Sequence, residues 1–145
     1  MVMQERFQTF TVLIARLNRC IRKIKTEEMA EFNLKSPHVS CLYYLYKSES
    51  LTAKELCDIC EEDKANISRS IEFLEKNGYL VCRSKTEKRY KSPLVLTEKG
   101  RQIHEMIESK IAETEEKLSA CLSEDEKKTL CFLLEKLRQN LESDR

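Results

Sequence analysis

Most of the structural information in this chain lies in one continuous segment, 51-LTAKELCDICEEDKANISRSIEFLEKNGYLVCRSKTEKRYKSPLVLTEKG-100. Apolar residues at helical spacing predict a helix that opens at Leu51, and after a short turn a second helix over 63–78. Alternating apolar residues predict one strand over 79–83 and another over 94–97, with a polar, basic loop between them.

Signals at the ends of these helices support the assignment. Thr52 and Glu55 are spaced as a capping box, in which each side chain binds a backbone N–H of the other residue. Asp63 is a typical N-cap for the second helix, and Asn77-Gly78 tolerates the left-handed backbone that ends a helix. Helix, turn, helix and basic hairpin in this order are typical of a winged helix-turn-helix, whose second helix enters the DNA major groove.

Helices are expected on both sides of this segment. A first helix over roughly residues 4 to 31 would carry an apolar stripe, and Ser36-Pro37 would begin a short helix in the middle of the core, with Ser36 as N-cap. Thr97 would begin a long helix, and the capping box Ser123…Glu126 would begin the last one. The predicted fold class is mainly α: a winged helix-turn-helix of about six helices plus a small β-hairpin wing.

The terminal helices carry more apolar surface than a DNA-binding module of this size needs. A lone helix with such a stripe is unstable in water unless the stripe is covered, and a second copy of the chain is the simplest cover. We therefore expect a single compact domain overall, with a helical dimerisation region at 1–35 and 98–145 and a DNA-binding region at 36–97. A two-fold dimer would place two recognition helices about one helical turn (~34 Å) apart on DNA.

Composition narrows the class of protein. The 145 residues are 41% hydrophobic and 35% charged, with two Gly and two Pro, which argues against an all-β or loop-rich fold. No apolar run is long enough to span a membrane, and the amino terminus lacks a signal-peptide pattern. The expected location is the cytoplasm, with no membrane partner.

The charge is unevenly distributed. From Lys64 to Arg101 there are ten Lys or Arg against four Glu, whereas the whole chain has a formal net charge of +1. A basic segment in a nearly neutral chain indicates local contact with a polyanion, here double-stranded DNA.

Over nearly its whole length the chain resembles the MarR family of bacterial transcriptional regulators. The matching pieces are 51-LTAKEL-56, 66-NISRSIEFLEKNG-78, the wing 85-KTEKR-89 and the exit 96-LTEKG-100. The resemblance implies a homodimer on pseudo-palindromic operators, often a repressor relieved by a small ligand. The family's wing usually has Asp-x-Arg, with the carboxylate bracing the arginine, whereas this chain has Glu87-Lys88-Arg89, whose longer carboxylate can still reach the guanidinium.

The DNA-contact prediction follows from helical periodicity. If Ile67, Ile71 and Leu74 are buried, positions 65, 66, 68, 69 and 72 point outward. Arg69 can read guanine, Asn66 can pair with adenine, and Ser68 can bind a base or a phosphate. The remaining predicted contacts are cations that approach the minor groove or the phosphates: Lys54, Lys64, Lys85, Lys88 and Arg89.

A ligand pocket is a second, weaker prediction. Tyr43, Tyr44 and Tyr46, with Arg16, Leu17 and Cys20, would line a cleft between the dimer helices and the DNA-binding lobe. In the family that this chain resembles, small aromatic molecules often bind there, so the expected ligand is aromatic or amphipathic. The alternative is that the tyrosines are plain aromatic core.

The seven cysteines are expected to be reduced and mostly buried. Cys57-x-x-Cys60 lacks a second Cys or His pair nearby, so neither a metal nor any other cofactor is predicted. A redox-responsive regulator of the same fold remains an alternative, with Cys20 the thiol closest to several cations.

No enzyme activity is predicted, because the sequence has no Gly-rich phosphate loop, nucleophile elbow or catalytic triad. The alternative from another class is a winged-helix module that binds proteins and has no sequence-specific DNA function. A steep salt dependence of duplex binding would favour the DNA-binding reading over that module.

Overall fold

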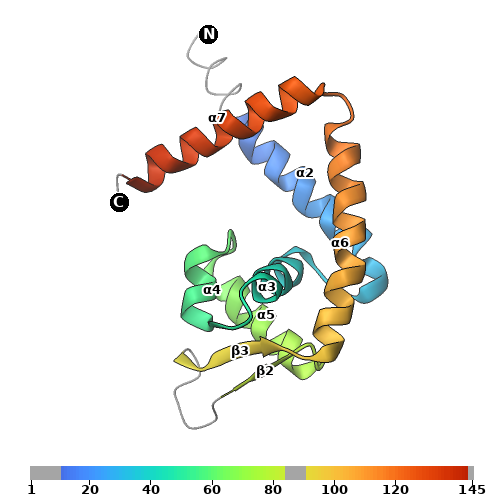
Figure 1. Ribbon diagram of the computed structural model, residues 1–145, viewed down its shortest axis with the longest axis vertical. Helices are drawn as coiled ribbons and strands as arrows, with labels where there is room; N and C mark the ends of the chain where they lie inside the picture. Colours follow the sequence, from blue (N-terminus) through green and yellow to red (C-terminus); the bar gives the residue numbers. More distant parts are fainter. Residues whose placement is uncertain (1–10, 84–90, 144–145) are drawn as a thin grey trace. The chain divides into compact units, whose positions relative to one another are not determined.

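The computed structural model describes residues 11–83 and 91–143, which divide into two compact units, 1–111 and 112–145. The second unit holds the end of α6 and all of α7. The elements, drawn in Figure 1, are α2 (Leu13–Glu28), the short 3-10 helix η2 (Ala30–Phe32), α3 (Ser36–Lys47), β1 (Leu51–Thr52), α4 (Ala53–Ile59), α5 (Lys64–Lys76), β2 (Leu80–Cys82), β3 (Pro93–Leu96), α6 (Glu98–Ser119) and α7 (Glu124–Ser143). The predicted fold class, mainly helical with a small winged sheet, is confirmed.

Helix α3 lies at the centre of the first unit (Figure 1). Its Leu42 and Leu45 are buried, and they belong to the same cluster as Leu56 of α4 and Leu74 of α5. α3 was predicted to lie in the middle of the core, and its burial on several sides confirms this.

The sheet has three antiparallel strands in the order β1-β3-β2. Leu80 pairs with Leu96 and Cys82 with Leu94, as expected of the hairpin, while Leu51 pairs with Leu94 from the other side. The expected helix start at Leu51 is therefore wrong: Leu51–Thr52 is a strand, and α4 begins at Ala53. Thr52 can both end β1 and cap α4, because strands and N-cap positions use the same extended backbone conformation.

Most of the predicted helix ends are confirmed. The Thr52–Glu55 and Ser123–Glu126 boxes form with bonds of 2.9 to 3.1 Å. Gly78 has a φ of +79° after α5. At Gly100 an added Cβ would lie 2.1 Å from the Tyr79 carbonyl oxygen, so only glycine lets α6 approach this close.

The N-cap of α3 is Lys35, one residue before the predicted Ser36. The side chain that satisfies this end is His38, whose Nδ1 accepts a hydrogen bond from the Lys35 backbone N–H at 2.9 Å. Phe73 of α5 stacks on the His38 ring with centroids 4.2 Å apart, so the core of the unit holds the ring in place.

Several apolar residues are more exposed than predicted. Ile59, expected to face inward, is 47% exposed at the end of α4. The described residues begin at 11, so residues 4–10 of the predicted first helix lie outside them. Leu17, in the apolar stripe predicted for this helix, is 60% exposed on α2. Among their described residues, neither α2 nor α7 has a buried residue.

Candidate DNA-binding surface

Helices α4 and α5 form the helix-turn-helix, and burial fixes which side of α5 faces outward. Ile67, Ile71 and Leu74 are at most 3% exposed. With these residues in the core, the helical period turns Ser68 and Arg69 to solvent and leaves Asn66 half-buried. The orientation predicted for α5 is therefore confirmed.

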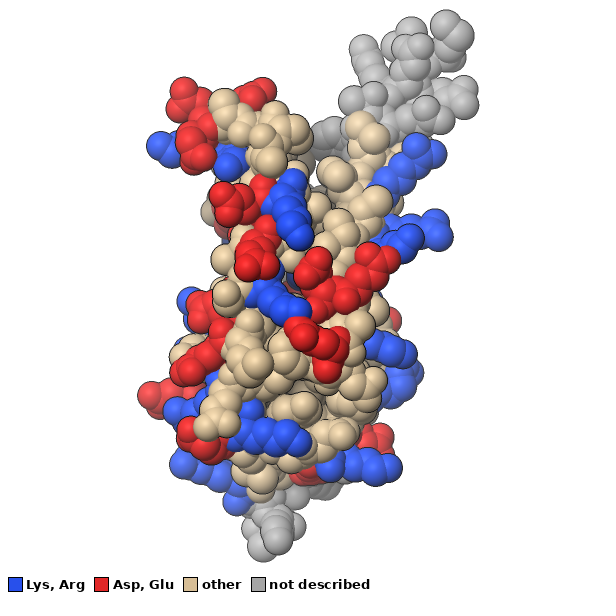
Figure 2. Space-filling model, turned by 90° about the vertical axis from the view of Figure 1, so that its right-hand side faces the viewer, with Lys and Arg blue, Asp and Glu red and all other residues tan. Residues whose placement is uncertain are grey.

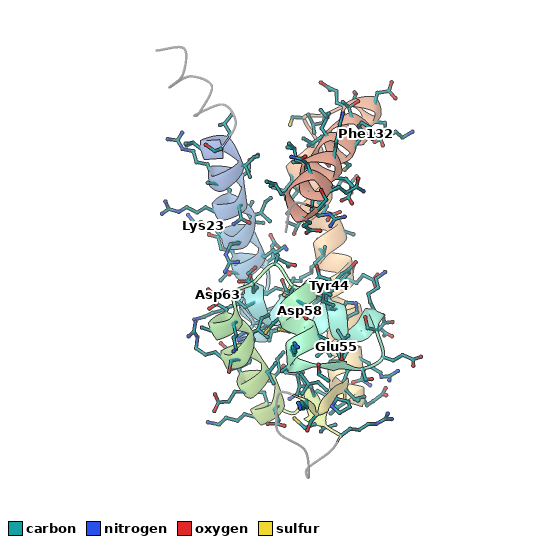
Figure 3. All side chains as sticks on the ribbon, turned by 90° about the vertical axis from the view of Figure 1, so that its left-hand side faces the viewer. Lys23, Tyr44, Glu55, Asp58, Asp63 and Phe132 are labelled. Carbon is teal, nitrogen blue, oxygen red and sulfur yellow. The ribbon has the colours of Figure 1, made fainter. Side chains whose placement is uncertain are left out.

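The amino-terminal half of α5 carries the polar groups that can read bases. Asp63 caps the helix by accepting a hydrogen bond from the Asn66 backbone N–H at 2.7 Å, and Figure 3 shows Asp63 at this end. The Asn66 side-chain oxygen accepts a hydrogen bond from Arg69 Nη2 at 2.6 Å. An amide and a guanidinium are thus held side by side on the exposed face before any DNA is bound.

A hollow of about 630 Å³ lies between α4 and α5. Three of the predicted DNA-contact residues line it: Lys54 of α4, and Lys64 and Ser68 of α5. Both lysines are exposed, so the hollow has two cations at its rim, as a phosphate contact requires. Lys85, Lys88 and Arg89 of the predicted wing lie outside the described residues.

The turn between α4 and α5 contains two functional candidates that the sequence analysis missed, Glu61 and Glu62. Glu61 accepts hydrogen bonds from the Ser40 hydroxyl at 2.5 Å and the Tyr44 hydroxyl at 2.9 Å, both on α3. Burial alone would raise the pKa of Glu61, but these hydrogen bonds, a backbone hydrogen bond and the charge of Lys25 hold that pKa below its usual value. Glu61 therefore stays ionised and ties the turn to α3.

Glu62 is buried, at 7% exposure, and pairs with Arg22 of α2. Its second oxygen accepts a hydrogen bond from Asn66 Nδ2 at 3.4 Å. The signal available in the sequence was an acidic run, Glu61-Glu62-Asp63, at the start of an otherwise basic segment. Only Asp63 of this run was assigned a role, because helix capping has a local pattern and the other two contacts are long-range.

The charged side chains on one face of the chain, the face that α6 forms, can be seen in Figure 2. Over the face that α6 forms, acidic and basic side chains are interspersed, and Lys and Arg gather toward the lower end of that view, where the sheet lies (Figure 2). A face of mixed charge offers no continuous cationic surface to a duplex. We therefore do not propose the α6 face for DNA contact.

The predicted ligand-pocket residues are distributed over different surroundings. Tyr44 faces the turn through Glu61, whereas Tyr46 stacks on the buried His104 of α6 with centroids 4.0 Å apart. Tyr43 and Tyr46 are about two-fifths exposed, at 41% and 40%. Arg16, Leu17 and Cys20 are exposed on α2. Neither the hollow between α4 and α5 nor a second hollow of about 500 Å³ beside the start of α3 is lined by these residues.

All seven cysteines lie in the described part of the chain, and none forms a disulfide. Only Cys41 is buried; Cys57, Cys60 and Cys82 are partly exposed, and Cys20, Cys121 and Cys131 are exposed, so the expectation of mostly buried thiols is wrong. Burial raises the pKa of Cys57, and it raises that of Cys60 to about 11. Among the described residues no group of three or more His, Cys, Asp or Glu is placed to hold a metal ion, and no helix there has the length and apolarity that a bilayer requires.

Comparison with known proteins adds to this geometry. The winged helix DNA-binding domain family matches residues 38–113. The HTH-type transcriptional regulator YwoH of Bacillus subtilis is 31% identical over 115 residues, which cover 79% of this chain and 83% of that protein. The HTH-type transcriptional regulator BilQ of Clostridium symbiosum is 31% identical over 100 residues, 69% of each chain.

Solved structures share the fold. MarR of Staphylococcus aureus in complex with salicylate and kanamycin superposes with a TM-score of 0.83 at 18% identity, covering 100% of this chain and 95% of that one. A MarR/EmrR family regulator from Acinetobacter sp. ADP1 has a TM-score of 0.83 at 24% identity, with 94% and 96% covered.

Proposed function

This chain belongs to the winged helix DNA-binding family and is a transcriptional regulator with the MarR fold, and from this premise we propose that it binds pseudo-palindromic operator DNA as a homodimer and represses transcription. The observation that carries the proposal is the exposed face of α5, where Asn66 and Arg69 are joined by a hydrogen bond beside Ser68. These side chains have the donors and acceptors that discriminate base pairs in the major groove.

Affinity and sequence preference are divided between two sets of residues in this proposal. Arg69, Asn66 and Ser68 read bases, because α5 presents them together. Lys54 and Lys64, at the rim of the hollow between α4 and α5, bind phosphates, and the wing cations Lys85, Lys88 and Arg89 approach the minor groove. Phosphate contacts supply affinity that falls with salt, whereas base contacts supply preference.

The homodimer is supported by apolar side chains that the single chain leaves exposed. On α2, Leu13 and Ile14 are each 44% exposed, and on α7 Phe132 is 66% and Leu141 is 67% exposed. Helices with apolar faces open to water are unstable unless another surface covers them. A second copy supplies the same helices and also places a second α5 on the duplex.

We extend the proposal to control by a small aromatic or amphipathic molecule. The Staphylococcus aureus relative was solved with salicylate, which is an aromatic acid. A ligand releases DNA only to the extent that it prefers a dimer whose recognition helices are wrongly spaced. In this chain it would bind near Tyr43, Tyr44, Tyr46, Arg16, Leu17 and Cys20.

Binding of the full-length protein to an array of random-sequence duplexes tests the central proposal. We expect one preferred sequence with two-fold symmetry, and binding that weakens steeply with salt. The double variant Asn66→Ala/Arg69→Ala should keep salt-dependent binding and lose the preference. Lys76→Ala, which removes a cation from the far end of α5, is the matched control and should keep it.

Two results would overturn the proposal. One is a folded wild-type protein that binds no duplex. The other is binding that is equal for all sequences, which is the behaviour of a winged-helix module without sequence-specific DNA function.

A further inference from the structure

We propose that Glu62 is a positioning residue for base reading: from the turn of the helix-turn-helix it links Arg22 of α2 to the Asn66–Arg69 pair on α5. This inference rests on the proposed function, since it concerns how the reading face is set. Figure 3 labels Lys23, next to Arg22, on α2 and Asp63, next to Glu62, at the start of α5, the two elements that this chain of contacts joins.

The first step is the burial of Glu62. Its side chain is only 2% exposed, and a carboxylate removed from water is costly unless a cation and hydrogen bonds compensate it. Arg22 provides the cation, and its own side chain is 36% exposed. Arg22 comes from a helix outside the helix-turn-helix, so α2 takes part in holding the turn.

The second step is the orientation of Asn66. A carboxylate can only accept hydrogen bonds, so the Asn66 group that faces Glu62 Oε2 at 3.4 Å must be the NH₂. The amide oxygen then points the other way and accepts from Arg69 Nη2 at 2.6 Å. A flipped amide would set oxygen against carboxylate and NH₂ against guanidinium, and both contacts would be repulsive. Glu62 therefore determines which edge of Asn66 is presented, and through Asn66 it sets the direction of Arg69.

The third step is the contrast with the neighbouring glutamate. Glu61 has the same charge in the same turn, but its partners Ser40 and Tyr44 are both on α3. No hydrogen bond between Glu61 and a residue of α5 is present in the described part of the chain. If Glu62 merely stabilised the turn, the two residues would be equivalent, and replacing either one should have the same effect on DNA reading.

The experiment compares Glu62→Gln with the matched control Glu61→Gln, which changes net charge equally. Affinities are measured in the full-length protein for the duplex that wild type prefers on the random-sequence array and for a scrambled duplex of the same composition. Glu62→Gln should lower the preferred-to-scrambled ratio about tenfold, since a well-placed base contact is lost. Glu61→Gln should keep the ratio within about twofold.

A double-mutant cycle separates positioning from general stability. Because Glu62 acts through Asn66, Glu62→Gln should lower the ratio no further, within about twofold, once Asn66→Ala is present. Thermal melting of each variant reports folding. If Glu62→Gln does not fold, Arg22→Gln decides, because it leaves Glu62 in place, removes its α2 partner and should lower the ratio in the same direction.

Equal losses in Glu61→Gln and Glu62→Gln would overturn the inference, as would additive losses in the cycle or an unchanged ratio in Arg22→Gln. In each of these cases wild type still prefers one duplex, so the proposed function survives. A wild type without any preferred duplex would instead overturn the proposed function, and this inference with it.

Discussion

Helices α5 and α7 begin with the same kind of N-cap but differ in how much of each helix is buried. Asp63 caps α5 and Ser123 caps α7, each by accepting a backbone N–H three residues on. Four residues of α5 are then buried in the first unit, whereas none of the described residues of α7 is buried. The comparison teaches that local capping can determine where a helix begins, while the burial of its apolar face depends on other surfaces. For α7 we propose that a second copy of the chain supplies that surface.

The largest expected effect comes from removing α7 altogether. A chain that ends before Ser123 loses the exposed leucines and Phe132 of that helix, and with them most of the proposed dimer interface. We expect aggregation or unfolding, measured by sedimentation and circular dichroism at micromolar concentration. A well-folded monomer, truncated or full-length, would show that α7 needs no second copy.

The second prediction compares the replacement of one apolar residue in α5 with the replacement of one in α7. Leu74→Ala should cost about 2–5 kcal/mol of unfolding free energy, because a fully buried side chain leaves a cavity. Phe132→Ala, at a side chain 66% exposed in the single chain, should instead weaken dimer formation. Urea unfolding and sedimentation equilibrium over a range of protein concentrations separate the two effects. A Phe132→Ala dimer as tight as wild type would remove α7 from the interface.

A third prediction compares the contribution of α5 to DNA binding with that of the wing. Arg69→Ala should reduce discrimination by about 1–3 kcal/mol at one base pair per half-site. Arg89→Ala should weaken binding to every duplex and reduce the salt slope by roughly 0.9 for each lost phosphate contact. Binding of both variants to preferred and scrambled duplexes at several salt concentrations is the measurement. If the two variants lose affinity and sequence preference to the same extent, the proposed division between base reading and phosphate binding is wrong.

Cap removal should affect the two helices alike. Asp63→Ala and Ser123→Ala each leave one backbone N–H without its cap, at a cost of about 1 kcal/mol in thermal unfolding. Asp63→Asn and Ser123→Thr keep an accepting oxygen and serve as controls. A much larger loss at Asp63 than at Ser123 would mean that the start of α5 depends on more than its cap.

The smallest effect concerns the thiols. Burial raises the pKa of Cys60 to about 11, so alkylation of Cys60 in the folded protein should accelerate only as the pH approaches that value. In urea the same thiol should react at lower pH, because the unfolded chain restores solvation. Mass spectrometry of peptides alkylated across a pH series measures this. Equal profiles in the folded and unfolded states would contradict the burial of Cys60.

A separate prediction concerns redox control through Cys57 and Cys60, because burial raises the pKa of both thiols. Peroxide should therefore not release the protein from DNA through these two thiols, whereas a small aromatic acid should release it. Peroxide release that survives in Cys20→Ser but fails in Cys57→Ser would contradict this prediction.

Patterns within a few residues predicted much of the fold. The capping boxes, the inward side of α5 and the strands of the hairpin all follow from spacing and side-chain type, and the structure confirms them. The errors occur where a distant partner intervenes: β1 pairs with β3, and Phe73 of α5 stacks on the His38 ring that satisfies the start of α3. Ile59 has helical spacing but is the last residue of a short helix and is 47% exposed there.

The DNA-reading face of α5 shows the same difference between local patterns and long-range contacts. Local periodicity was enough to place Asn66, Ser68 and Arg69 on the outer side of α5, because buried residues three and four apart fix a helix's orientation. Periodicity could not reveal that Glu62 meets Arg22 across forty positions of sequence, or that Glu61 meets Ser40 and Tyr44. Those contacts exist only after α2, α3 and the turn are packed together, since pairing between residues so far apart in sequence depends on the folded backbone and leaves no periodic trace.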